Sequence, residues 1–373
     1  MDEEISNPVF VRHERIAMSS IELVHVTQEK APSSEIAELP FVSVIMPIRN
    51  EQRSISRVLD CLLAQDYPQD RLEILVADGM STDNTRRVVS VAAAGDSRIR
   101  LLNNPQQIMA SGFNLGLKAA RGDIIMMMGG HTEVATNYVS IAASLLRKEL
   151  ADCVGGPINT VGETDVAQAI SLAMSSRFGV GGSAFRCGCR ERRYVDTVAF
   201  GAYARNIMER AGPLDEEFVR NQDDEFNYRM RKLGGKILID PELRSWYTSR
   251  SSIRTLWRQY FQYGYWKVRV LQKHPRQMQL RQFVPAAFVL SLLLSLILAA
   301  VRPKIGNRMM LLEGGSYFLA TLLVSMSLAG ARRRWRLAPA LAVSFPVLHF
   351  SYGAGFLVGL AKFSIRRRPR EGA

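Results

Sequence analysis

The sequence predicts an α/β domain with a mostly parallel β-sheet, followed by transmembrane helices at its C-terminal end. Three observations support this prediction. From about residue 41, short apolar runs typical of strands alternate with segments of helical periodicity. A polar turn follows each of these apolar runs. Beyond about residue 283 the alternation gives way to long apolar stretches that are nearly free of charged residues, as expected for membrane-spanning helices.

Four strands and three helices can be assigned in order along the first part of the chain. The predicted strands are 41–46, 73–77, 99–102 and 124–128, and the predicted helices are 54–63, a segment ending near 94, and 110–120. This alternation favours a parallel sheet with helices on both faces. Ligands of such sheets bind beyond the carboxyl ends of the strands. The polar residues that follow the strands are Arg49, Asn50, Glu51, Asp78, Asp83 and His131.

Composition indicates what the protein binds. A net charge of +13 suits nucleic acid, an anionic membrane surface or a phosphorylated substrate. Much of the positive charge lies beside the apolar segments, at 332–336 and 366–370, which favours a membrane surface. The four cysteines are irregularly spaced and lack histidines at metal-binding spacing, so we expect reduced thiols. The N-terminus has acidic residues and no apolar signal segment, which predicts synthesis without secretion.

An acidic stretch at 221–229 contains the side chains best suited to take a proton from a hydroxyl group. Asp223, Asp224 and Glu225 are consecutive, and Arg229 follows them. Crowded like charges raise the pKa of at least one carboxyl group while a nearby arginine lowers another, so the carboxylates can take different roles. The alternative is a solvated helix start, with carboxylates at the positive end of the helix dipole and Arg229 paired to Glu225. The stretch alone leaves both interpretations open.

Eight short motifs occur in a specific order and spacing. They lie at 44–51, 78–83, 114–116, 120–123, 201–203, 212–216, 221–229 and 260–267. Together, over about residues 41–275, they resemble the family 2 glycosyltransferases, which have the nucleotide-sugar-binding GT-A fold. More narrowly, the chain resembles the succinoglycan-type membrane glycosyltransferases of bacterial exopolysaccharide synthesis. The resemblance implies a hexosyltransferase enzyme.

The resemblance also implies which residues bind the nucleotide-sugar donor, expected to be a UDP-hexose. They are Pro47, Arg49, Asn50, Glu51, Asp78, Asp83, Gly129 and Gly130. Among these, Asp78 is expected to accept hydrogen bonds from the base. Each residue also has an ordinary interpretation, since Asp78 and Gly79 can form a simple turn and Glu51 can be a helix N-terminal charge.

A divalent cation is implied as well, although this chain departs from the family pattern. The fourth strand of such enzymes ends in Asp-x-Asp or Asp-Gly-His, whereas this sequence has Gly129, Gly130 and His131. His131 is therefore the candidate ligand for Mn2+ or Mg2+, and Mn2+ tolerates imidazole better. The alternative is a histidine whose nitrogens are occupied by hydrogen bonds within the loop.

By the same resemblance, Asp223 is the general base that deprotonates the acceptor hydroxyl, and Asp224 and Glu225 tune its pKa or position the acceptor. A single displacement would invert the configuration of the sugar. Aromatic and cationic residues at 253–275 suit the bilayer interface, where a lipid-linked saccharide acceptor would be met. Single-stranded nucleic acid would use similar residues, but no nucleic-acid motif accompanies them, so no nucleic-acid partner is expected.

The expected organisation has four parts. They are a flexible extension at 1–38, a GT-A catalytic domain at 39–250, amphipathic interfacial helices at 251–281, and a membrane domain at 282–373 with hydrophobic segments at 283–301, 311–330 and 337–361. The expected location is the inner membrane, with the catalytic domain in the cytoplasm. Three crossings would place the arginines of 366–370 outside, against the positive-inside tendency. One segment is thus expected to be re-entrant or interfacial, unless the tendency is broken.

The function expected from these features is transfer of a hexose to a lipid-linked saccharide in exopolysaccharide or related glycan assembly. The alternative is a non-catalytic scaffold that binds a sugar nucleotide or lipid within a polysaccharide complex. The glycine at 129 favours the scaffold, and the intact Asp223 favours the enzyme. A processive synthase would need more membrane helices and a Gln-x-x-Arg-Trp motif, which the sequence lacks.

Overall fold

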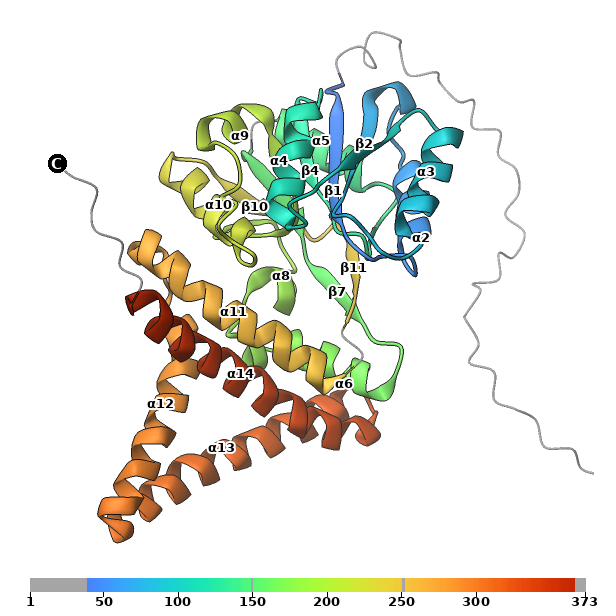
Figure 1. The fold of residues 1–373 in the computed structure, drawn as a ribbon. Coiled ribbons are helices and arrows are strands. Elements are labelled where there is room, and N and C mark those ends of the chain that lie inside the picture. Colours follow the sequence, from blue (N-terminus) through green and yellow to red (C-terminus); the bar gives the residue numbers. More distant parts are fainter. Residues whose placement is uncertain (1–38, 149, 250–251, 366–373) are drawn as a thin grey trace, which may run out of the picture. The chain divides into compact units, whose positions relative to one another are not determined.

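An eight-stranded sheet organises the part of the chain that the computed structural model describes, residues 39–148, 150–249 and 252–365. The extension expected at 1–38 lies outside the described residues. The strand order is β3-β2-β1-β4-β9-β6-β10-β8 (Figure 1). β1 pairs in parallel with β2 and β4, and β9 runs antiparallel between β4 and β6. The strands are β1 Val42–Ile48, β2 Leu72–Asp78, β3 Ile99–Asn103, β4 Ile124–Met127, β6 Cys153–Gly156, β8 Arg193–Val195, β9 Ala199–Ala204 and β10 Ile237–Ile239.

Helices cover both faces of this sheet, because successive strand residues point to opposite sides. In β1, Val44 and Met46 pack against the first group of helices, while Ile45 packs against the second. The first group is α2 Ile55–Leu63, α3 Thr85–Gly95 and α5 Tyr138–Arg147, and the second is α4 Met109–Ala119, α9 Arg205–Ala211 and α10 Gln222–Lys232. The strands and helices predicted up to residue 128 are present within a few residues of their expected bounds.

A second, three-stranded sheet has the order β5-β11-β7. Its strands are β5 Thr132–Val134, β7 Ile158–Val161 and β11 Ser245–Thr248. β5 begins directly after His131, so this small sheet continues from the end of β4. Three helices follow β7 and lie on the side of the membrane helices in Figure 1, namely α6 Asp165–Met174, α7 Arg177–Val180 and α8 Ala184–Cys187.

Two long helices, α11 (Ile253–Lys273) and α14 (Ala338–Ile365), lie side by side below the sheet (Figure 1). Glycines allow their backbones to touch. A Cβ atom on Gly264 of α11 would lie only 2.0 Å from the carbonyl oxygen of Tyr352, and one on Gly355 of α14 would lie 2.1 Å from that of Phe261. Small residues permit this close approach in helices near or within membranes. α14 is thus fixed to a helix that also contacts α10, through the ion pair of Lys267 with Asp224.

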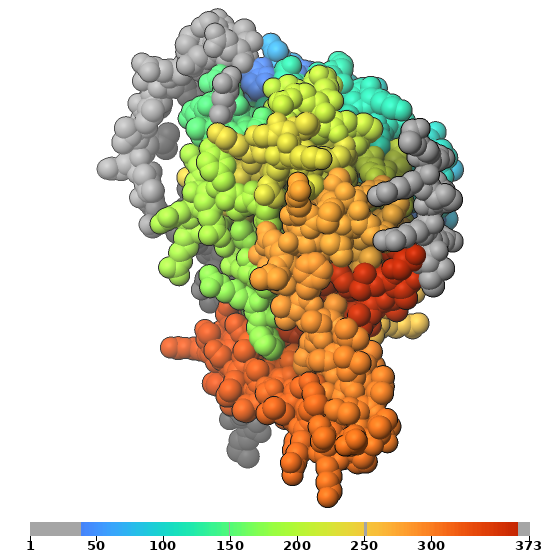
Figure 2. All heavy atoms as spheres, turned by 90° about the vertical axis from the view of Figure 1, so that its left-hand side faces the viewer, coloured from blue at the N-terminus to red at the C-terminus, as the bar shows by residue number. Residues whose placement is uncertain are grey.

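α12 (Leu280–Val301) and α13 (Pro303–Ala331) form a hairpin that projects away from the sheet (Figures 1 and 2). All three C-terminal helices are long and apolar enough to cross a membrane. Most apolar side chains of the hairpin are exposed, as suits contact with lipid. Its carboxylate, Glu313, accepts a hydrogen bond from Ser295 Oγ at 3.1 Å, so a polar contact joins the two helices.

Candidate functional site

A cavity of about 1680 Å³ lies beyond the carboxyl ends of β1 and β4 and reaches the membrane helices. At the sheet end it is lined by Asn50 and Glu51 after β1 and by His131 after β4. Asp223 of α10 lines it as well, and the far end is formed by apolar and aromatic residues of the C-terminal helices. Of the residues predicted for the site, the cavity includes Pro47, Arg49, Asn50, Glu51, Gly129, Gly130, His131, Asp223 and Asp224.

Asn50 joins the turn after β1 to the turn after β2. Its φ of 56° lies in the left-handed region, which asparagine tolerates better than most residues. Its backbone N–H donates to Ser81 Oγ at 2.9 Å, and its side-chain oxygen accepts from the Thr82 N–H at 2.8 Å. The two strand ends are therefore held in a fixed relation at the mouth of the cavity.

His131 and Glu51 form a directly bonded pair in the cavity wall. His131 Nδ1 lies 2.8 Å from Glu51 Oε1. A carboxylate only accepts, so Nδ1 carries the proton and, in the neutral ring, Nε2 keeps its lone pair. A Cβ on Gly130 would lie 2.8 Å from Glu51 Cγ, so the glycine makes room for this carboxylate. The described residues contain no cluster of three or more metal-ligating side chains.

Three of the predicted site residues, Asp78, Asp83 and Glu225, do not line the cavity. Asp78 is fully buried, accepts hydrogen bonds from Ser81 and forms an ion pair with Arg86 at 3.3 Å. The next residue, Gly79, does line the cavity. Asp83 accepts from the Thr85 N–H at 3.0 Å at the start of α3. The carboxylates of Asp78 and Asp83 thus stabilise the turn after β2 through hydrogen bonds, and they do not line the cavity.

The carboxylates of α10 have distinct environments. Asp223 is half-buried in the cavity wall, and burial together with the neighbouring charge of Asp224 raises the pKa of its carboxyl group, while Lys267 opposes that shift. Asp224 forms an ion pair with Lys267 of α11, and Lys267 is itself almost fully buried. Asp223 is thus the carboxylate better suited to exchange a proton, and Asp224 the one held by a cation.

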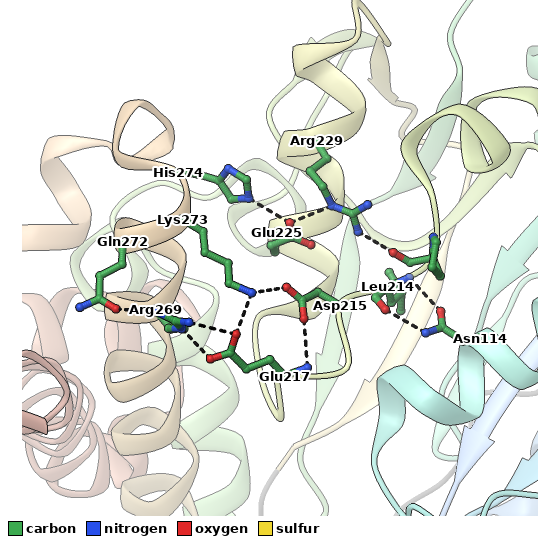
Figure 3. Close-up of polar contacts among 11 residues, drawn as sticks. Asn114, Leu214, Asp215, Glu217, Glu225, Arg229, Arg269, Gln272, Lys273 and His274 are labelled. Carbon is green, nitrogen blue, oxygen red and sulfur yellow. Dashed lines mark hydrogen bonds and ion pairs between the residues drawn. The ribbon is translucent and has the colours of Figure 1, made fainter. Parts of the chain in front are cut away.

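Glu225, the third carboxylate, is 2% exposed and does not line the cavity. Its side chain lies between those of Arg229 and His274, the residue that follows α11 (Figure 3). Its Oε1 atom accepts from Arg229 Nε at 2.8 Å and lies 2.9 Å from His274 Nε2. Arg229 also donates to the carbonyl oxygens of Ala211 and Pro213. The pairing of Glu225 with Arg229 is the one that the helix-start interpretation expected, and it fixes α10 to its surroundings.

Among the basic cavity residues that were not singled out as site residues from the sequence, two are of interest. Lys267 was included only as part of an aromatic and cationic segment, and Arg186 lies directly before a Cys-Gly-Cys sequence that carries no recognisable motif. Both reach the neighbourhood of Asp223 from elements distant in the sequence. No local sequence pattern predicts that Lys267 and Arg186 lie near Asp223, because their positions depend on how α8 and α11 pack.

Comparisons with known proteins identify similar chains. The family model described as glycosyl transferase family 2 matches residues 43–235. The chain is 30% identical over 331 residues to the dolichyl N-acetyl-alpha-D-glucosaminyl phosphate 3-beta-D-2,3-diacetamido-2,3-dideoxy-beta-D-glucuronosyltransferase of Methanococcus voltae, covering 86% of this chain and 98% of that protein. It is 28% identical over 327 residues to the succinoglycan biosynthesis protein ExoA of Rhizobium meliloti, covering 87% and 96%.

Among solved structures, the mannosyltransferase PcManGT from Pyrobaculum calidifontis, in complex with GDP-Man and Mn2+, is similar at a TM-score of 0.52 and 19% identity. The match covers 90% of this chain and 89% of that one. At this identity the similarity establishes a common fold, the GT-A fold. In this chain, three C-terminal helices long and apolar enough to cross a membrane follow it.

Proposed function

The chain belongs to glycosyl transferase family 2, and from this premise we propose that it transfers a hexose from a UDP-sugar to a lipid-linked saccharide. The observation that carries the proposal is the single cavity that runs from the strand ends to the membrane helices, with Asp223 in its wall. A soluble donor and a membrane-bound acceptor could meet in it without either substrate leaving its own phase. Pockets that bring two substrates together in this way supply much of the rate enhancement.

The donor end is formed by the joined turns after β1 and β2. Asn50, Glu51 and Gly79 line it, with Asp78 directly behind Gly79. For Asp78 to accept a hydrogen bond from a base, as the family resemblance implies, its contacts with Ser81 and Arg86 would have to be shared or exchanged. Binding of uridine in this position is therefore part of the proposal.

His131 is the residue that we propose holds a divalent cation. Its Nδ1–H donates to Glu51, which leaves Nε2 as the ligand atom, and this is the carboxylate–histidine arrangement common behind metal ligands. Imidazole suits Mn2+ better than Mg2+. When bound, such a cation would neutralise charge on the departing diphosphate. The donor phosphates and water would have to complete its coordination, since the described residues supply no cluster of three ligating side chains.

Asp223 is proposed as the general base. Its carboxylate takes the proton from an acceptor hydroxyl as that oxygen forms a bond to C1 of the sugar. The bond between C1 and the diphosphate oxygen breaks in the same step, and the diphosphate leaves with the electron pair. Attack from the face opposite the leaving group inverts the configuration at C1.

The acceptor is proposed to enter from the membrane end. Phe288, Tyr317 and Leu348, from the three C-terminal helices, line that end of the cavity, and such side chains suit a lipid chain rather than a soluble sugar. The names of the two relatives refer to a dolichyl phosphate-linked sugar and to succinoglycan biosynthesis. They support a role in exopolysaccharide or related glycan assembly, and we propose the cytoplasmic face of the inner membrane as its place.

Turnover should depend on pH through Asp223. Because burial and Asp224 raise the pKa of this carboxyl group, it becomes protonated, and the rate falls, at a higher pH than for an ordinary aspartate. Asp224→Asn removes a negative charge and leaves the cation of Lys267 beside Asp223, so the acidic limb of kcat/KM should move down by about one pH unit. In Asp165→Asn, which alters an exposed ion pair on α6, the limb should stay in place. An unmoved limb in Asp224→Asn would argue against Asp223 as the titrating base.

The structure also suggests how the chain crosses the membrane. Of the most apolar stretch of α14, 44% is buried, compared with 17% in α12 and 11% in α13. We infer that α12 and α13 cross as a hairpin while α14 stays at the interface, packed on α11. With two crossings instead of three, the arginine-rich sequence at 366–370 no longer conflicts with the positive-inside tendency.

This topology predicts the outcome of two labelling experiments on the full chain in cells. A fluorescent protein fused to the C-terminus should fluoresce, since it would fold in the cytoplasm. Asn307→Cys, at the far end of the hairpin, should react with a membrane-impermeant maleimide added outside, above the background of the unmodified chain. A dark C-terminal fusion would mean that α14 crosses the membrane.

The proposed donor is tested by hydrolysis of a panel of UDP-sugars by the detergent-solubilised protein, with and without Mn2+. We expect one UDP-sugar to be turned over and the rate to depend on Mn2+. Absence of turnover even after a lipid-saccharide extract is added would favour the alternative, a scaffold that binds substrates without reacting them.

A further inference from the structure

Arg186 is a half-buried cation in the cavity wall for which the described residues provide no partner of opposite charge. It lies in α8 and lines the cavity together with Phe185. Within the described part of the chain, its guanidinium group makes no hydrogen bond or ion pair, and its one recorded contact is with the face of the Phe185 ring, at 5.3 Å from the centroid. A charge withdrawn from water without a partner is costly, so its retention in a cavity calls for a ligand.

Comparison with the other basic residues of the cavity makes Arg186 distinct. Lys267 is paired with Asp224, and Arg281 lies 3.3 Å from Asp196. Arg49, Arg53, Arg177 and Arg220 line the cavity too, but they are exposed, and water can solvate them. Arg57 is exposed as well and is paired with Glu133 at 3.7 Å. Arg186 has no carboxylate from the described part of the chain within ion-pair distance, and it is only partly accessible to solvent.

The surroundings of Arg186 keep its guanidinium group charged. Burial lowers the pKa of this group, but Tyr260, Tyr263, Tyr247 and Asp223 together raise it, and the net shift is upward. The ring of Tyr247 in turn contacts the ring of His131, with centroids 5.1 Å apart. Arg186 is thus within electrostatic reach of Asp223 and of Tyr247, a neighbour of His131.

We propose that Arg186 binds a phosphate group of one of the two substrates, either the diphosphate of the donor or the phosphate of the lipid-linked acceptor. The planar guanidinium fork matches phosphate oxygens, and such charge-assisted bonds are the strong ones. The inference rests on the proposed function only in taking the substrates to be phosphorylated. Because Arg186 is near Asp223, it would hold a phosphate group of either the donor or the acceptor close to the point of transfer.

The test compares Arg186→Gln with Arg190→Gln, an exposed arginine beyond the same helix that does not line the cavity. Binding to the full-length protein in nanodiscs is measured for three pairs of probes: UDP against uridine, decaprenyl phosphate against decaprenol, and inorganic pyrophosphate against buffer. We expect Arg186→Gln to weaken at least one phosphate-bearing probe by about 10-fold to 100-fold, with the phosphate-free member of its pair unchanged. Arg190→Gln should bind all probes as the unmodified protein does.

The pattern of loss identifies the source of the phosphate. If Arg186→Gln loses affinity only for UDP and pyrophosphate, Arg186 binds the donor. If it loses affinity only for decaprenyl phosphate, Arg186 binds the acceptor. Equal affinities of Arg186→Gln and the unmodified protein for every phosphate probe would overturn the proposal, as would an unmodified protein that binds none of them. If the unmodified protein binds pyrophosphate and decaprenyl phosphate but not UDP, only the proposed donor is wrong.

A second variant guards against misfolding. Arg186→Lys keeps the charge but loses the fork, so it should retain part of the affinity that Arg186→Gln loses. Both variants should unfold at the temperature of the unmodified protein, since the described residues provide no hydrogen-bond partner for Arg186. If Arg186→Gln loses affinity for a phosphate probe and Arg186→Lys keeps all of it, the proposal is still supported. If Arg186→Gln loses affinity for UDP and uridine equally, the proposal is contradicted.

Discussion

Asp223→Asn is expected to lower kcat for sugar transfer by about 10²-fold to 10⁴-fold, the range associated with loss of a general base. The amide has nearly the same shape as the carboxylate but cannot accept the proton of the acceptor hydroxyl. The Asp223 side chain lines the cavity, and in the described structure its recorded hydrogen bond is with the N–H of its neighbour Asp224. The substitution should therefore leave the fold and the affinity for UDP unchanged.

The measurement is a comparison of kcat, KM and UDP affinity for Asp223→Asn and the unmodified protein. Asp215→Asn serves as a control, because Asp215 is paired with Lys273 outside the cavity and Glu217 keeps that lysine partnered after the substitution. Retention of most of kcat in Asp223→Asn would assign proton removal to another group.

Glu225→Ala is expected to reduce the free energy of unfolding by about 3 kcal/mol, because removal of one partner from a buried ion pair leaves the others uncompensated. Glu225 lies between Arg229 and His274 and joins α10 to the end of α11 (Figure 3). The resemblance to the family placed Glu225 among the catalytic carboxylates. Its position outside the cavity supports a structural role instead, which this substitution tests.

Urea-induced unfolding of the detergent-solubilised protein, followed by tryptophan fluorescence, measures the effect. The matched control is Glu217→Ala. Glu217 is paired with Arg269 and Lys273 in the same region, but its side chain is 41% exposed, so its loss should cost at most about 1 kcal/mol. A Glu225→Ala protein with normal stability and no activity would instead support a catalytic role for Glu225.

The first half of the fold could be predicted from the sequence because its signals are local. β1 and β2 have seven residues each, most of them apolar and nearly all of them buried, and each strand is followed by a polar turn. The later strands gave no comparable signal. β8 and β10 have three residues each and obtain their place from pairing with distant strands. The family resemblance and the GT-A fold are confirmed by the comparisons.

The candidate site could be predicted in part, for a similar reason. Residues that directly follow a strand, such as Asn50 and His131, line the cavity because the geometry of a parallel sheet brings strand ends together. Asp83 also belongs to the turn after a strand, but its carboxylate accepts a hydrogen bond from the Thr85 N–H at the start of α3 and does not line the cavity. Arg186 and Lys267 reach the cavity through the packing of α8 and α11, which no spacing in the sequence specifies. The catalytic and binding roles of all these residues remain predictions.

The central claim is that this cavity joins a soluble sugar nucleotide to a lipid acceptor. The most direct test is to incubate the full-length protein with the radiolabelled UDP-sugar that it hydrolyses and a lipid-saccharide extract from its source cells, and then to partition the products between water and organic solvent. The account predicts label in the organic phase as a lipid-linked saccharide one hexose longer, and none with Asp223→Asn. Label that appears only as free sugar in water, whatever lipid is added, would contradict it.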